Sequence, residues 1–108
     1  MDAESGPGGR YGTISGPRGR GHGLELAGEI DAAAVSGFED EQGAAPVPVD
    51  AIDAGAVTFI AAVGVALLLR YAAVGPAGGP VLRRSSPRLD RVLELIRLTE
   101  VFRRPPEP

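Results

Sequence analysis

Apolar and polar residues first alternate regularly in the segment 24–31, LELAGEID. Leu24 and Leu26 fall on one side and Glu25 on the other, which is typical of a half-buried strand. Gly28 is expected to end the strand in a turn, because glycine adopts turn conformations without steric cost. The pattern therefore predicts a short strand where the ordered part of the chain begins.

A helix over residues 32–41 is expected next. Asp31 can cap it, because its carboxylate can accept free amide protons of the first turn. Gly37 weakens the helix. Val35 and Phe38 lie three residues apart and can share one buried face.

The longest apolar run follows a second alternation. Residues 47–52, VPVDAI, alternate and predict a strand, and residues 53–57 are expected to form a turn. Residues 58–60 begin the apolar run. The helix expected over 62–74 is apolar almost all round, which favours burial against a sheet.

A third strand is expected at 80–84, and a helix begins after it. Ser86 is a good N-cap, and Pro87 suits the first helical position. The apolar face of this helix is expected to consist of Leu89, Val92, Leu93 and Ile96. Strands alternating with helices indicate an α/β sandwich, with a mixed sheet of about four strands covered by helices.

Residues 54–69 carry no charge, which raises the question of a membrane span. A spanning helix needs about 20 apolar residues, and Arg70 would lie near the middle of a longer one. Proline and glycine residues between 76 and 80 break any continuation. A strand followed by a buried helix fits better, and no membrane contact is expected.

The length of 108 residues allows one small domain. We expect a Gly/Arg-rich flexible leader at 1–23, the domain at 24–104 and a Pro-rich tail at 105–108. The piece RGRGHG at 18–23 is similar to Arg/Gly segments that contact RNA, but a plain leader is the preferred interpretation, and no direct nucleic-acid binding is expected. The N-terminus has no apolar signal region, so we expect a cytoplasmic protein.

Charge is unevenly distributed. Every charged residue from Glu25 to Asp53 is acidic, whereas Arg dominates from Ala54 to Arg104. This polarity can steer a partner, although internal pairing of the two halves is the simpler explanation. There is no Cys, and the one His lies in the leader. We therefore expect no enzyme, no cofactor and no metal site.

Four segments resemble the STAS domain, the family of anti-sigma-factor antagonists. LAGEID at 26–31, VTFIAAVGVALLLR at 57–70, GPAGGPVL at 75–82 and SPRLDRVLELIRLTEVF at 86–102 occur in the family's order. The last segment is the most specific in its spacing. The resemblance implies a bacterial protein that regulates transcription by binding an anti-sigma factor of the serine-kinase type.

The chain departs from the family at the position where a partner kinase phosphorylates the family's members. The resemblance implies an acid, a phospho-acceptor hydroxyl and a second hydroxyl at Ala61, Ala62 and Val63, followed by the retained Gly64. An alanine methyl cannot accept a phosphoryl group. The chain would then stay in a binding-competent form, or partner choice has changed along with the lost polar groups. The remaining nearby hydroxyls are those of Thr58 and of Ser85 or Ser86, and they are minor candidates for a substitute phosphosite.

The expected partner-binding surface is the start of the second helix with the segment before it. Its candidate residues are Asp50, Asp53, Gly55, Ala61, Ala62, Val63, Gly64 and Val65. Three alternatives remain open. The domain is a ligand- or nucleotide-sensing module with an arginine patch near the third helix, a subunit of a larger STAS assembly, or a decayed domain.

Overall fold

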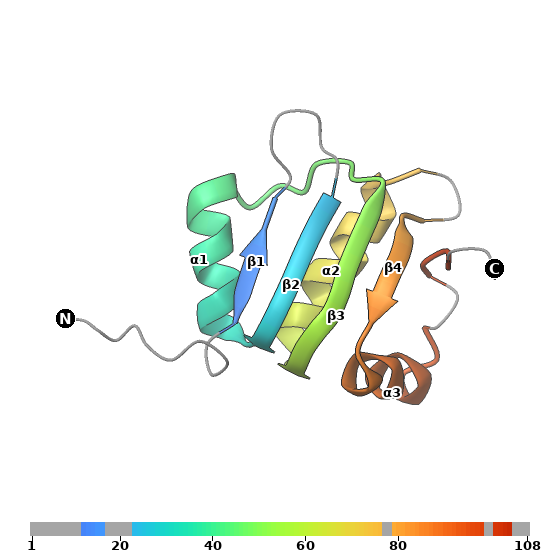
Figure 1. The fold of residues 1–108 in the computed structure, drawn as a ribbon. Coiled ribbons are helices and arrows are strands. Elements are labelled where there is room, and N and C mark those ends of the chain that lie inside the picture. Colours follow the sequence, from blue (N-terminus) through green and yellow to red (C-terminus); the bar gives the residue numbers. More distant parts are fainter. Residues whose placement is uncertain (1–11, 17–22, 77–78, 99–100, 105–108) are drawn as a thin grey trace.

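The computed structural model describes residues 12–16, 23–76, 79–98 and 101–104. Strands and helices alternate along most of this part of the chain (Figure 1). The elements are β1 (Thr13–Ser15), β2 (Gly23–Ile30), α1 (Ala32–Gln42), β3 (Ala51–Ile60), α2 (Ala62–Val74), β4 (Val81–Ser85) and α3 (Pro87–Leu95).

The four strands form one mixed sheet in the order β1-β2-β3-β4. β2, β3 and β4 are parallel because α1 and α2 cross over between them, whereas β1 runs antiparallel to β2. The predicted α/β fold with about four strands is thus confirmed.

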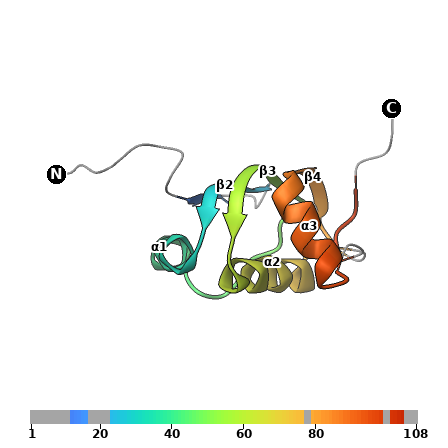
Figure 2. The same cartoon turned by 90° about the horizontal axis from the view of Figure 1, so that it is seen from below.

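Helices α1 and α2 cover the same face of the sheet (Figure 2). Leu24 and Leu26 of β2 and Ile52 and Ala54 of β3 point to this face and are buried. On the opposite face Glu25 is exposed, and no helix of the described residues covers it.

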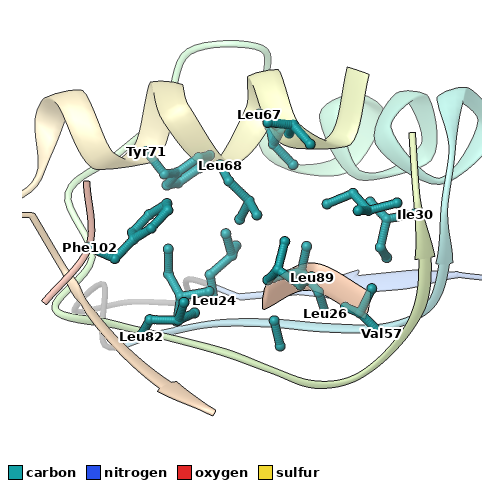
Figure 3. Packing of buried hydrophobic residues seen from close by; sticks show 14 of the residues in the cluster. Leu24, Leu26, Ile30, Val57, Leu67, Leu68, Tyr71, Leu82, Leu89 and Phe102 are labelled. Atoms are coloured by element: carbon teal, nitrogen blue, oxygen red, sulfur yellow. The ribbon is translucent and has the colours of Figure 1, made fainter. Parts of the chain in front are cut away.

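Helix α2 fills the centre of the core (Figure 3). Its Leu67, Leu68 and Tyr71 are at most 2% exposed and face the buried side chains of the sheet. Each fully buried leucine contributes about 1.5–3 kcal/mol of burial free energy. The apolar run therefore comprises a strand end and a buried helix, as its length and flanks indicate. Among the described residues, no helix is long and apolar enough to cross a membrane.

The two outer helices bury the predicted faces in part. Val35 and Phe38 of α1 are buried, and so are Leu89 and Leu93 of α3. The prediction for Ile96 was wrong, because α3 ends at Leu95 and Ile96 remains 43% exposed.

Two predicted turns lie inside strands. β2 passes through Gly28, whose φ is 78°, and its pairing with β3 shifts register after this residue. Residues 53–57 belong to β3, which begins only at Ala51. The earlier residues 47–50 do not extend the strand, because Pro46 and Pro48 have no amide proton for a ladder.

β1 lies inside the segment 1–23 that the sequence predicted to be a leader. Ile14 packs partly on the core. A Cβ on Gly12 would lie 1.8 Å from the carbonyl oxygen of Glu29, so only glycine fits there. The predicted flexible leader, including the Arg/Gly piece, lies largely in residues 1–11 and 17–22, which are outside the described residues. The predicted tail at 105–108 is also outside them.

Candidate partner-binding surface

The start of α2 lies at the end of the sheet where the parallel strands β2 and β3 finish (Figure 1). Ala61 is the N-cap residue between β3 and α2. Its amide donates to the carbonyl oxygen of Ile30, the last residue of β2, at 2.9 Å. The helix start is thus held against the sheet by a backbone hydrogen bond.

No side chain caps α2. Ala61 has the extended conformation of an N-cap, with φ −87° and ψ 168°, but an alanine methyl accepts no hydrogen bond. By contrast, Asp31 caps α1 through the amide of Ala34, and Ser86 caps α3 through that of Leu89. The backbone geometry of a capped helix persists at Ala61 without the capping group.

Exposed apolar side chains lie on both sides of this helix start in sequence. Phe59 is 43% exposed and Val63 is 38% exposed, and Ala62 is exposed between them in sequence. We call Phe59, Ala62 and Val63 the α2-start surface. Ala62, which the resemblance implies to be at the phospho-acceptor position, is exposed to solvent.

Phe59 is the residue of this surface that the sequence analysis missed. Val57 pairs with Gly28, but Phe59 pairs with the next residue, Glu29. Thr58 is therefore an extra residue in β3, and such a bulge turns the following side chain to the other face. Strict alternation would have buried Phe59 beside Val57.

Gly64 and Val65 belong to the buried side of the helix start. A Cβ on Gly64 would lie 2.8 Å from side-chain carbons of both Ile30 and Ile60. Gly64 therefore lets α2 approach the strand ends closely. It shapes the site without contacting a partner itself.

The remaining predicted site residues lie elsewhere. Asp50 is exposed in the segment before β3, and Asp53 and Gly55 lie in the strand itself. With about 3.3 Å per strand residue, Asp53 is about 23 Å from Ile60. The structure therefore does not bring these three residues to the start of α2.

Asp53 instead joins β3 to β4. Its Oδ2 accepts hydrogen bonds from Nε and Nη2 of Arg84, at 3.0 and 2.7 Å, and its Oδ1 accepts one from the Gly55 amide at 3.1 Å. The hydrogen bonds from Arg84 lower the pKa of Asp53 below its ordinary value of 3.8. These contacts explain Asp53 as a structural residue of the open sheet face.

The arginine patch expected near α3 consists of Arg83, Arg84, Arg88 and Arg91, and Arg84 already pairs with Asp53. Ser86, a candidate for a substitute phosphosite, already accepts a hydrogen bond from the amide of Leu89. Within the described ranges, no group of three or more acidic or histidine side chains could hold a metal ion.

Comparison with known proteins gives matches among solved structures. No model of a protein family and no curated protein matches the chain. An anti-sigma factor antagonist from Mycobacterium paratuberculosis matches at 26% identity and a TM-score of 0.64, over 90% of this chain and 87% of the other. The unphosphorylated form of the anti-sigma factor antagonist SpoIIAA matches at 19% identity and a TM-score of 0.56, over 90% of each chain.

The resemblance to the STAS domain is thereby confirmed. The structural neighbours of this chain are anti-sigma factor antagonists, and they cover nine-tenths of it.

Proposed function

We propose that this chain is an anti-sigma factor antagonist that regulates transcription in bacterial cytoplasm by binding an anti-sigma factor of the serine-kinase type. The fold shared with an antagonist of 26% identity supports the class of function. The exposed, hydroxyl-free start of α2 carries the rest of the proposal.

In this proposal, the antagonist is not switched by phosphorylation at Ala62. The exposed position is accessible to a kinase, but its side chain offers no oxygen. A phosphate at a helix start changes local charge by about −1.5 to −2 and alters docking. Since Ala62 cannot acquire that charge, the binding-competent form persists in the presence of ATP.

The contact itself is apolar. Phe59 and Val63 present exposed apolar area next to the helix start, where a polar Asp and Ser are absent. A partner that docks here buries Phe59 as an aromatic anchor, and such anchors carry much of the energy of an interface. The partner's counter-surface is therefore expected to be apolar.

Calorimetric titration against the anti-sigma kinases of the same host tests this function. We expect tight binding of the wild-type chain. Phe59→Ala or Val63→Asp should weaken binding by about tenfold or more, as expected when an interface anchor is lost.

Val74→Asp is the matched control for Val63→Asp. Val74 is 41% exposed on the same helix but lies at its opposite end. It should leave affinity unchanged. If none of the kinases binds a folded wild-type chain, the proposed function is wrong. If all three variants bind equally well, the kinase docks elsewhere.

A further inference from the structure

Two helix ends carry charges that oppose the dipole of their own helix. The last turn of α1 contains Glu39, Asp40 and Glu41 and no basic residue. Carboxylates are unfavourable at this negative end of a helix. Arg88 lies in the first turn of α3, where a positive charge is unfavourable, whereas Asp90 in the same turn is favourable.

The fold compensates only part of this charge. Glu39 pairs with Arg70 at 2.6 Å. Asp40, Glu41, Arg88 and Arg91 are exposed, and none of them enters an ion pair with another described residue. Charges that a fold places against local stability and does not pair point to a contact outside the chain.

The basic charges form a stripe with an apolar end. Arg88, Arg91 and Leu95 follow one another at i, i+3 and i+7, so they lie along one side of α3. Leu95 is 70% exposed, the highest value among the exposed large apolar side chains of the described residues. We call these three residues the α3 stripe.

Of the acidic residues, Glu41 lines a groove between α1 and β1. This groove of about 350 Å³ is lined by residues 12–15 and by Ala33, Ala34, Gly37, Phe38 and Glu41. A Cβ added to Gly37 would meet no atom within 4 Å, so the wall is open there. We call this hollow the α1–β1 groove.

The stripe and the groove match in spacing and in charge. Arg91 and Leu95 are four residues apart, as are Glu41 and Gly37, and residues at this spacing are neighbours on a helix. If α3 of one copy of the chain lies antiparallel to α1 of a second copy, Leu95 of the first lies over Gly37 of the second. Arg91 of the first then lies beside Glu41 of the second. Apolar contact and charge pairing can then form together.

We propose that the α3 stripe of one copy of this chain docks in the α1–β1 groove of a second copy. α1 and α3 lie at opposite edges of the sheet, α1 beside β1 and α3 beside β4 (Figures 1 and 2), so one chain cannot make the contact with itself. Such a head-to-tail interface leaves one stripe and one groove free and can add further copies. The inference does not rest on the proposed function.

Sedimentation velocity of the full chain tests this self-association. At low ionic strength, the sedimentation coefficient should rise with protein concentration. At about 1 M salt, where the Debye length is about 3 Å, it should fall toward the monomer value. Arg91→Glu alone and Glu41→Arg alone should each give monomers, because each leaves like charges facing one another.

An equimolar mixture of Arg91→Glu and Glu41→Arg should associate again, because each variant offers the charge that the other lacks. Arg83→Glu is the matched control, since it makes the same charge change at an exposed residue of β4 outside the stripe. It should associate like the wild type. A wild-type chain that stays monomeric at every concentration overturns the proposal. A mixture that fails to associate, or a control that dissociates like Arg91→Glu, overturns it as well.

Discussion

The starts of α2 and α3 follow neighbouring parallel strands but are built in opposite ways. α3 begins with a capping Ser86, Pro87 in its first turn and Asp90 close behind, and Ser86 is 5% exposed. α2 begins with Ala61, has no capping side chain and no acid in its first turn, and is flanked by exposed Phe59 and Val63.

The difference separates a structural helix start from a candidate functional one. Ser86 satisfies an amide of the first turn and Asp90 favours the helix dipole, so the fold alone accounts for these two residues. The start of α2 forgoes this stabilisation and exposes apolar area. Departures from local rules of this kind concentrate at sites of function.

Gly64→Ala should have the largest effect on stability. The new methyl group would lie 2.8 Å from carbons of Ile30 and Ile60. Overpacking of this kind costs about 1–3 kcal/mol. Urea denaturation should show this loss. Gly37→Ala in α1 meets no neighbour and should instead gain about 0.5–1 kcal/mol from helix propensity. Equal effects of the two substitutions would contradict close packing at Gly64.

Ser86→Ala should destabilise the chain by about 1 kcal/mol, because the buried amide of Leu89 loses its acceptor. Thermal and urea unfolding measure the loss. Ser36→Ala, at an exposed position of α1, should be close to neutral. An unchanged stability of Ser86→Ala would mean that the cap of α3 contributes nothing.

Ala61→Asp should stabilise the chain by about 0.5–1 kcal/mol, because the backbone at this position already has N-cap geometry. Ala73→Asp places the same charge near the other end of α2 and should destabilise it. The same unfolding curves compare the two. A loss of stability in Ala61→Asp would show that the α2 start cannot accept a cap.

The smallest effect concerns the Asp53–Arg84 pair. The folded pKa of Asp53 lies below its ordinary value of 3.8, so its stabilisation is present above that pH and is lost as the pH falls through the folded pKa. The Arg84 side chain is 71% exposed, so solvent screens the pair. The stability difference between wild type and Asp53→Asn should therefore be small at neutral pH and should shrink below about pH 4. A difference that grows on acidification would contradict this assignment.

Local sequence signals predicted the helices well, whereas the exposure of Phe59 and the role of Asp53 depend on pairing between strands that are distant in sequence. The bounds of α2 followed from an apolar run between a strand and a glycine-rich loop, and the start of α3 followed from its cap. The exposure of Phe59 depends on a bulge against β2, which no local pattern indicates. Asp53 was assigned to the segment before α2, but its partner Arg84 is 31 residues away in sequence.

The central claim is that the α2 start binds a partner kinase and cannot be switched off by it. The most direct measurement adds ATP to the complex of this chain with its anti-sigma kinase, followed by intact mass. We predict that the complex persists and that the chain gains no phosphate. The double variant Ala61→Asp/Ala62→Ser should gain phosphate and dissociate, whereas Ala66→Ser, one turn further along α2, should do neither. Phosphate on the wild-type chain, with release of the kinase, would contradict the account.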